Sequence, residues 1–248
     1  KPPMPLQHID TGWKFKAMYA MRDQIVKQYG VDLRVHKNPE GLARGLSPIV
    51  HGAKVFTDVM KTQGLLQALS IGKFDAAIGG ARRDEEASRA KERVFSFRSS
   101  SNAWDPKNQR PELWDLYNTR LHKGEHFRAF PISNWTELDV WQYIAREKLA
   151  VPSIYYAHER LVVDRRGLLA PITEITPPRA GETPVIRTVR FRTVGDITCT
   201  CPVLSDAATV EEILFETTVT RITERGATRM DDQTSDASME LRKKEGYF

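Results

Sequence analysis

Cysteine is nearly absent from this chain, with Cys199 and Cys201 its only two in 248 residues. Their one-residue spacing is poor for a mutual disulfide, and two ligands are too few for a structural zinc site. Sparse cysteine favours a reducing, cytoplasmic setting. We therefore interpret both cysteines as structural and assign no metal ligand to the chain.

Long hydrophobic runs and blocks of like charge are also missing. No apolar stretch approaches the length of a membrane span and no signal-peptide pattern is present, so we expect no membrane association. The 37 Lys and Arg residues exceed the 32 Asp and Glu residues by only five, and the basic residues are scattered. This scatter favours a small anionic substrate over nucleic acid.

The first hundred residues alternate between short apolar runs and segments with helical periodicity. We predict strands at 6–10, 31–35 and 74–78, helices at 13–29 and 57–70, and a loop over 38–54. Strands alternating with helices are typical of an α/β fold. The pattern predicts a doubly wound, mostly parallel sheet with flanking helices.

After Pro152 the chain changes character. Beyond a strand at 127–132 and a helix at 136–148, we predict a hairpin around 164–167, a strand at 185–194, a helix at 209–223 and a polar tail. We divide the chain into an α/β domain, residues 1–150, and an irregular C-terminal region, 151–248. Arg190 and Arg192 share a face of the predicted strand. We expect them either to make a second anion contact or to face a protein partner, and we favour the latter.

The segment Phe74–Arg98 carries the clearest candidate site. Gly79 and Gly80 close the apolar strand, and arginines follow at 82, 83, 89, 93 and 98. On a helix, Arg82, Arg89 and Arg93 would share one face. Glycines that let the backbone approach a ligand, helical N–H groups and guanidinium donors together predict a site for phosphate or sulfate.

A solvent-exposed helix laced with salt bridges would explain the same charges, because acidic residues are nearly as frequent in this segment. The two glycines at the end of a buried strand favour the site, since ligands of open α/β sheets bind at the carboxyl ends of strands. His8, Asp10 and Thr11 lie at the end of the first strand. His8 and Asp10 either contact a ligand there or only form a turn and a helix cap. We interpret the tryptophans as local anchors rather than base-stacking platforms.

Several motifs resemble those of the small, catalytic subunit of the bacterial two-subunit sulfate adenylyltransferases. Two motifs are shared with the wider superfamily that includes phosphoadenylylsulfate reductases: His8-Ile9-Asp10-Thr11 and Pro131–Trp141. More specific ones are Gly79–Glu86, Arg89–Arg93, Trp104–Trp114 (WDPKNQRPELW), Val189–Thr193 and the ending Ser238–Leu241 with Glu245–Phe248. The resemblance extends from Leu6 to Phe248.

The resemblance implies that ATP and sulfate react to give adenylyl sulfate and pyrophosphate, with magnesium bound mostly by the phosphates. It also implies a larger GTPase partner subunit, whose GTP hydrolysis drives the uphill reaction. On the matching motifs, Arg82, Arg83 and Arg89 would be catalytic. His8, Asp10, Thr11, Gly79, Gly80 and Arg93 would bind the nucleotide.

One departure from the family concerns its phosphate-binding loop, a Ser-x-Gly-Lys-Asp-Ser pattern, which would precede the first strand and is not found. We expect the sequence to be an N-terminally shortened form of an active subunit. Three alternatives remain: a thiol-dependent reductase on the same fold, an RNA-modifying relative, and a non-catalytic scaffold for the GTPase. The tail carries no cysteine and no RNA-binding module is visible, which disfavours the first two.

Overall fold

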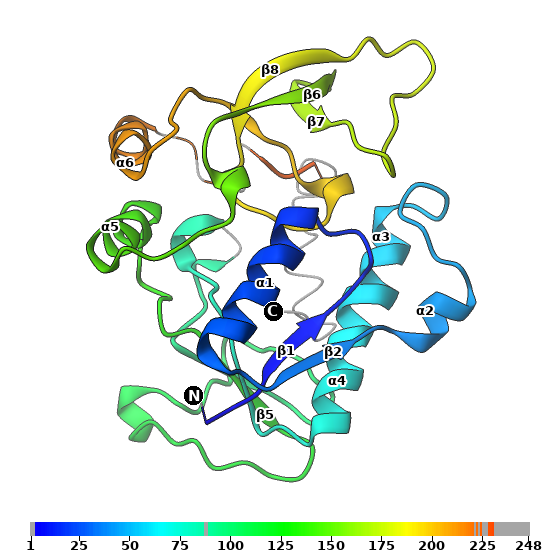
Figure 1. Ribbon diagram of the computed structural model, residues 1–248. Coiled ribbons are helices and arrows are strands. Elements are labelled where there is room, and N and C mark those ends of the chain that lie inside the picture. The colour runs from blue at the N-terminus through cyan, green and yellow to red at the C-terminus, as the bar shows by residue number, and fades with distance from the viewer. Residues whose placement is uncertain (1–2, 87–88, 221, 223, 225–227, 231–248) are drawn as a thin grey trace. The chain divides into compact units, whose positions relative to one another are not determined.

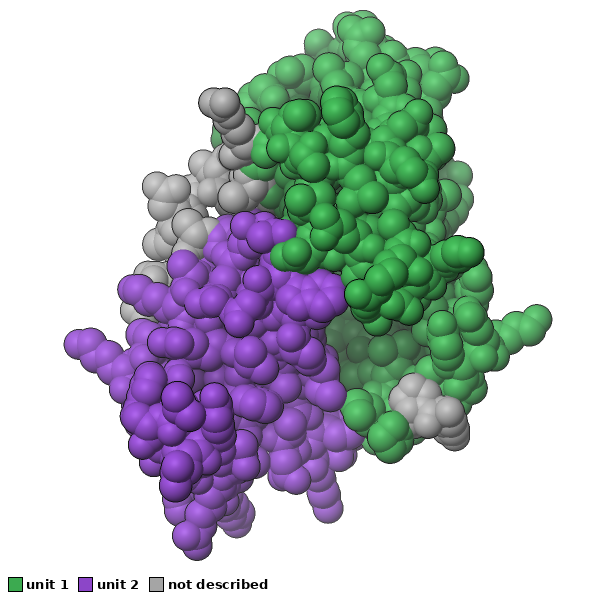
Figure 2. Space-filling view, turned by 90° about the vertical axis from the view of Figure 1, so that its left-hand side faces the viewer, with its two compact units in different colours: residues 1–35, 137–234 green, residues 36–136, 235–248 purple. Residues whose placement is uncertain are grey.

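A computed structural model describes residues 3–86, 89–220, 222, 224 and 228–230 of the chain (Figure 1). Helices and strands alternate in a mixed α/β arrangement, as the sequence predicts. The chain groups into two compact units, each discontinuous in sequence (Figure 2). Unit 1 comprises residues 1–35 and 137–234, and unit 2 comprises residues 36–136 and 235–248. The predicted division of the chain into domains at residue 150 is a different division from this grouping and stays a prediction.

Unit 1 begins with the predicted strand, helix and strand. Strand β1 (Leu6–Ile9) and strand β2 (Leu33–His36) form a two-stranded sheet, and helix α1 (Lys16–Tyr29) connects them. The helix ends because Gly30 adopts a left-handed conformation with φ 59°, from which its N–H bonds to the carbonyl of Val26. Glycine adopts this conformation without steric cost.

The rest of unit 1 is an antiparallel sheet with two helices. Its strands are β6 (His158–Arg165), β7 (Leu168–Pro171), β8 (Val185–Arg190) and β9 (Val203–Leu204), in the order β7-β6-β8-β9. Helices α5 (Glu137–Glu147) and α6 (Val210–Val219) and 3₁₀ turns η5 (Ser153–Tyr155) and η6 (Ile197–Cys199) complete it. The predicted hairpin is confirmed, since β6 and β7 pair antiparallel.

Two buried hydrophobic clusters hold unit 1 together. One joins the start of the chain to the C-terminal sheet through Phe15, Ile154, Phe191 and Ile197. The other, made by Trp141, Ala207 and Ile213, joins α5 to α6. Removing these side chains from water is the main favourable contribution to folding.

Arg190 and Arg192 lie inside unit 1 and not on a partner-facing strand. Their exposed fractions are 0% and 6%. Arg190 contacts Glu216 at 2.7 Å, and Arg192 pairs with Glu137 on α5. The prediction of a solvent-facing basic strand is therefore wrong for these two residues, because carboxylates of unit 1 neutralise both.

Unit 2 contains a three-stranded sheet and a group of helices. Strands β3 (Ala76–Ile78), β4 (Phe95–Arg98) and β5 (His126–Ala129) lie in the order β3-β5-β4. The helices are α2 (Pro39–Ala43), α3 (Ala53–Phe56), the π-helix η1 (Thr57–Gln63) and α4 (Gly64–Gly72), with 3₁₀ turns η2 (Arg83–Glu85) and η4 (Leu113–Asp115). The loop predicted at 38–54 thus contains α2, whose first amides are capped by the Asn38 side chain.

The strands in the described part of the chain form three sheets rather than one. In unit 2, β3 pairs parallel with β5, whereas β4 pairs antiparallel with it. A parallel return requires a crossover, usually through a helix. The segment between β3 and β4 has no α-helix among its described residues, so β4 returns antiparallel. The mixed α/β class is confirmed, but a single doubly wound sheet is not what these strands form.

Candidate anion-binding site

The arginine-rich segment leaves strand β3 as an irregular loop. Gly79 continues the parallel pairing by donating its N–H to the carbonyl of Ala129 at 2.9 Å. Beyond it, Arg83–Glu85 forms only a 3₁₀ turn. The predicted helix with Arg82, Arg89 and Arg93 on one face is therefore wrong. Alanines are the only apolar residues of 81–93, so a helix here would have no apolar face to bury.

The glycines after β3 adopt ordinary conformations. Neither Gly79 nor Gly80 has a positive φ. A Cβ atom added at Gly80 would meet only the Cδ1 atom of Ile132, at 4.0 Å. The fold thus leaves open space at Gly80, and its role in admitting a ligand stays a prediction.

Two of the predicted arginines are buried and bound within unit 2. Arg89 is 5% exposed, and its Nε and Nη1 atoms contact Glu85 at 2.6 Å and Glu92 at 3.2 Å. Arg82 is 6% exposed and donates to the Trp135 carbonyl at 3.4 Å. A solvent-exposed helix does not describe these residues, which instead hold the loop in place.

The other two predicted arginines, Arg83 and Arg93, line a polar pocket of about 400 Å³ in unit 2. Arg83 donates to the Asn134 side chain, and Arg93 Nε lies 3.4 Å from the buried carboxylate of Glu112. The pocket has nine lining residues in all: Arg83, Ala90, Lys91, Arg93, Pro106, Lys107, Gln109, Glu112 and Trp114. Four cations against one carboxylate make it strongly positive, which suits an anionic ligand.

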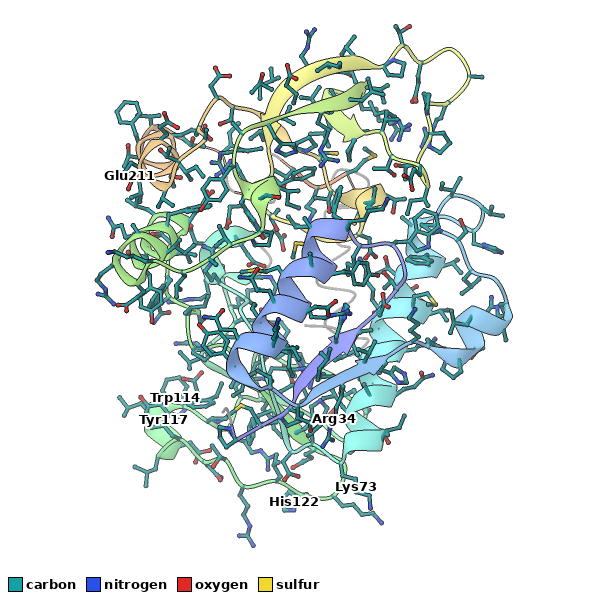
Figure 3. The ribbon with its side chains drawn as sticks, in the orientation of Figure 1. Arg34, Lys73, Trp114, Tyr117, His122 and Glu211 are labelled. Atoms are coloured by element: carbon teal, nitrogen blue, oxygen red, sulfur yellow. The ribbon has the colours of Figure 1, made fainter. Side chains whose placement is uncertain are left out.

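Sequence reasoning missed Lys91, Lys107 and Trp114 as residues of this pocket. Trp104 is an anchor as predicted, 7% exposed and beneath the Arg98 guanidinium at 6.0 Å. Trp114 is not an anchor, because it is 76% exposed at the surface of unit 2 (Figure 3). The motif Trp104–Trp114 was the available signal, since it contains both Lys107 and Trp114.

Further basic side chains lie buried in the sheet of unit 2. His126 stands opposite Arg98 in the β4–β5 register, and Arg128 follows two residues later. Burial lowers the pKa of Arg98 to about 10 and that of Arg128 to about 9, where Arg98 adds repulsion. Burial, then Arg128 and Arg98, lower the pKa of His126 to about 4. The imidazole is therefore neutral at pH 7.

The predicted residues His8, Asp10 and Thr11 belong to unit 1, at the end of β1. The Asp10 carboxylate accepts the Gly12 N–H at 2.9 Å and the Tyr19 hydroxyl at 2.6 Å. Thr11 donates to Asp196 at 2.9 Å, and both residues are buried. Burial, followed by the bond to Asp10, raises the pKa of Tyr19. Asp10 therefore forms the expected turn, but it does not cap α1, whose N-cap is Phe15 without a side-chain cap bond. Contact of these residues with a ligand stays a prediction.

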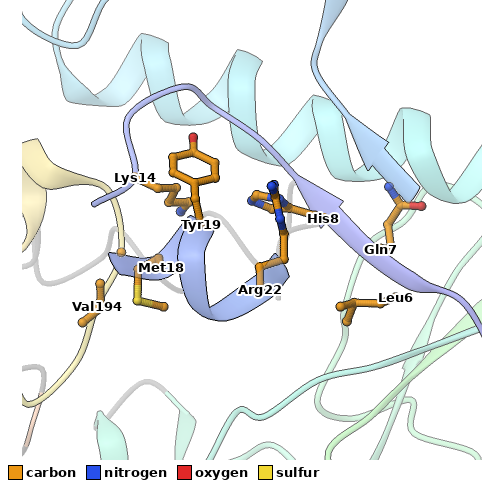
Figure 4. A pocket seen from close by; sticks show the side chains of 9 residues that line it. Leu6, Gln7, His8, Lys14, Met18, Tyr19, Arg22 and Val194 are labelled. Carbon is orange, nitrogen blue, oxygen red and sulfur yellow. The ribbon is translucent and has the colours of Figure 1, made fainter. Parts of the chain in front are cut away.

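His8 faces a pocket of about 240 Å³ beside β1 and α1 (Figure 4). Arg22 contacts its Nδ1 atom at 2.8 Å, which makes Nδ1 the acceptor and places the ring proton on Nε2. Burial lowers the pKa of His8, which favours this neutral form. Lys14 and Arg22 also line the pocket, together with apolar Leu6, Met18 and Val194.

Within the part of the chain that the structure describes, no group of three or more His, Cys, Asp or Glu could hold a metal ion. None of the helices described is long and apolar enough to cross a bilayer. Cys199 and Cys201 are buried, with exposed fractions of 5% and 0%.

The chain is similar to known proteins over its whole length. Residues 1–202 match the model of the phosphoadenosine phosphosulfate reductase domain, which places the chain in that class. A protein of Xanthomonas euvesicatoria pv. vesicatoria, named sulfate adenylyltransferase subunit 2, is 58% identical over 249 residues, covering 100% of this chain and 82% of the relative. Proteins of the same name from Caulobacter vibrioides and a Marinomonas species are 57% and 54% identical, over 100% of this chain and 80% and 82% of their own lengths. The chain belongs to the sulfate adenylyltransferase subunit 2 family, as the motifs predicted.

Proposed function

We propose that this chain transfers the adenylyl group of ATP to sulfate, with adenylyl sulfate and pyrophosphate as products. The observation that carries the proposal is the cationic pocket of unit 2, in a chain of this family. A sulfate oxygen attacks the α-phosphorus, and the bond from that phosphorus to the pyrophosphate oxygen breaks.

The chemistry asks the protein for charge neutralisation and positioning rather than a covalent nucleophile. Both substrates are anions that repel each other, and preorganised cations offset that repulsion as they approach. Arg83 and Arg93 are the predicted arginines that face the pocket. Arg82 and Arg89 act as positioning residues, because their bonds to Trp135, Glu85 and Glu92 fix the loop that carries Arg83.

The nucleotide-binding assignments of His8, Asp10, Thr11, Gly79 and Gly80 remain part of the proposal. Gly80 is supported by the open space beside it and His8 by its place in a pocket. Asp10 and Thr11 would act by shaping the end of β1. Magnesium would enter with ATP and be held by its phosphates, since Mg²⁺ keeps few protein ligands in such sites.

The subunit number in the relatives' name supports a partner subunit for this chain. We propose that the partner is a GTPase that couples GTP hydrolysis to adenylyl sulfate synthesis, and that both act in the cytoplasm. The scattered surface charge supports small anions and a protein partner rather than nucleic acid.

A thiol-dependent reductase is the second candidate, favoured by the domain family that the chain matches. Its chemistry would need an accessible thiolate. Burial of both cysteines argues against it. A thiol-blocking reagent that abolished activity would favour this candidate.

The deciding experiment assays adenylyl sulfate formation from ATP and radiolabelled sulfate by the complete protein with its partner, with and without GTP. We expect product that increases when GTP is present. Product that is independent of GTP would contradict the coupling, while binding of the partner without product would favour a scaffold.

A further inference from the structure

The cationic pocket contains two lysines, Lys91 and Lys107, to which the proposed reaction assigns no role. Lys91 follows the buried Arg89 by two residues, and Lys107 lies in the Trp104–Trp114 motif. Both side chains are exposed, and among the residues described neither has an ion pair or side-chain hydrogen bond. The two arginines beside them are held, by Asn134 and by Glu112.

Unpaired cations gathered around one pocket repel one another unless an anion lies between them. The lining provides four cations and a single carboxylate, Glu112, which already contacts Arg93. At pH 7 the pocket therefore carries three positive charges in excess. A doubly charged anion would offset most of this repulsion.

The pocket offers two kinds of hydrogen-bond donor, guanidinium and ammonium groups, and their geometry indicates the shape of the anion. Arginine offers a planar fork that binds two oxygens at once, whereas lysine is a point charge with three rotatable donors. Two guanidinium groups, in contact with Asn134 and Glu112, and two ammonium groups can together donate to the oxygens of a tetrahedral ion from several sides. Gly79 and Gly80, predicted to meet the nucleotide, are not among the lining residues.

We propose that this pocket binds the tetrahedral oxyanion of the reaction, and that Lys91 and Lys107 are binding residues for it. The oxyanion is sulfate or a phosphate group of the nucleotide, and the absence of Gly79 and Gly80 from the lining favours sulfate. The inference rests on the proposed function and extends it to residues outside the arginine motif.

Sulfate binding to the complete protein tests the proposal directly. Titration calorimetry with inorganic sulfate at constant ionic strength would compare the wild type with Lys91→Gln and Lys107→Gln. We expect each substitution to weaken sulfate binding by about tenfold, as for the loss of one charge-assisted contact. Lys123→Gln is the matched control, because Lys123 is an exposed lysine of the same unit that does not line the pocket.

Kinetics with the partner subunit distinguish the two oxyanions. A KM for sulfate raised in the lysine variants, with the KM for ATP unchanged, would assign the pocket to sulfate. A raised KM for ATP alone would assign it to a nucleotide phosphate. Sulfate binding and KM values equal to those of Lys123→Gln would overturn the proposal. A wild type that binds sulfate through these lysines but makes no adenylyl sulfate would contradict the proposed function alone.

Discussion

At the scale of single residues, burial decides which basic side chains of unit 2 carry charge. His126 lies on β5 among the guanidinium groups of Arg98 and Arg128, and its pKa is lowered to about 4. In the unfolded chain a histidine titrates near about 6.5. Between these values the unfolded state binds a proton that the folded state does not bind. The free energy of unfolding must therefore fall as the pH is lowered through this window.

We expect His126→Gln to flatten this pH dependence. Denaturant unfolding at several pH values between about 6.5 and 4.5 would give the slope for wild type and variant. His122→Gln is the control, since His122 is exposed on the same unit. Equal slopes for the wild type and His126→Gln would show that this imidazole is protonated to the same extent in both states.

Residue-level prediction from the sequence succeeded where chemistry is local and failed where neighbours come from distant segments. The Glu85–Arg89 pairing follows from their spacing and is present even without a helix. Arg93 meets Glu112 and Arg83 meets Asn134, partners that no local pattern specifies. The same holds for Trp114, whose exposure depends on how the loop around it is placed.

At the scale of secondary structure elements, a buried ion pair joins helix α5 to the segment after β8. Arg192 Nε donates to Glu137 at 3.1 Å, its Nη2 contacts the other carboxylate oxygen, and both side chains are less than a tenth exposed. Arg192 also donates to the Ile222 carbonyl at 3.0 Å. Removing one member of such a pair leaves a buried charge without compensation.

We expect Glu137→Gln to lower the free energy of unfolding by about 3 kcal/mol, measured by urea denaturation. The control is Glu147→Gln on the same helix, because the Glu147–Arg146 pair is exposed and should contribute less than about 1 kcal/mol. Equal effects of the two substitutions would mean that burial does not strengthen the Glu137–Arg192 interaction. Replacing both partners with apolar residues, in Glu137→Leu with Arg192→Met, should recover part of the loss.

Helices and strands could be predicted from the sequence where turn-forming residues mark their ends. The β6–β7 hairpin follows from Arg166-Gly167, which adopt φ angles of 59° and 79° as a two-residue hairpin turn requires. The helix at 57–70 was predicted as one regular element, yet its first half is a π-helix over Thr57–Gln63. Apolar periodicity reports which side of a helix is buried and does not resolve a change in its winding.

At the scale of the whole molecule, the pairing of the strands could not be predicted from the sequence. Apolar strand signals at 6–10 and 74–78 give the existence of strands but not their partners, and the described strands divide among three sheets. Strand pairing depends on contacts between segments far apart in the chain. Forming these contacts costs chain entropy, and local sequence patterns carry no information on that cost. β4 runs antiparallel because the described residues between β3 and β4 contain no α-helix to provide a crossover.

The reaction rates of the two cysteines report how readily the C-terminal part of unit 1 opens within the whole molecule. Cys199 and Cys201 are the only thiols of the chain, and both are buried. The Cys201 N–H donates to the Thr228 carbonyl, and Thr200 forms an antiparallel β-bridge with Arg229. A thiol reagent can react only when this part of unit 1 opens, so its rate reports the free energy of opening. We expect reaction in native buffer to be slower than in denaturant by about a thousandfold or more, with two thiols titrating after unfolding.

The same measurement separates the two enzyme classes, because a reductase would need one thiol open to solvent in the native state. For an adenylyltransferase, activity should persist throughout an incubation in which native thiols remain unmodified. Fast modification that leaves adenylyl sulfate synthesis intact would show that the C-terminal part of unit 1 opens without disturbing the site. Fast modification that abolishes activity would move one of these cysteines into the chemistry and contradict the structural role that their burial supports.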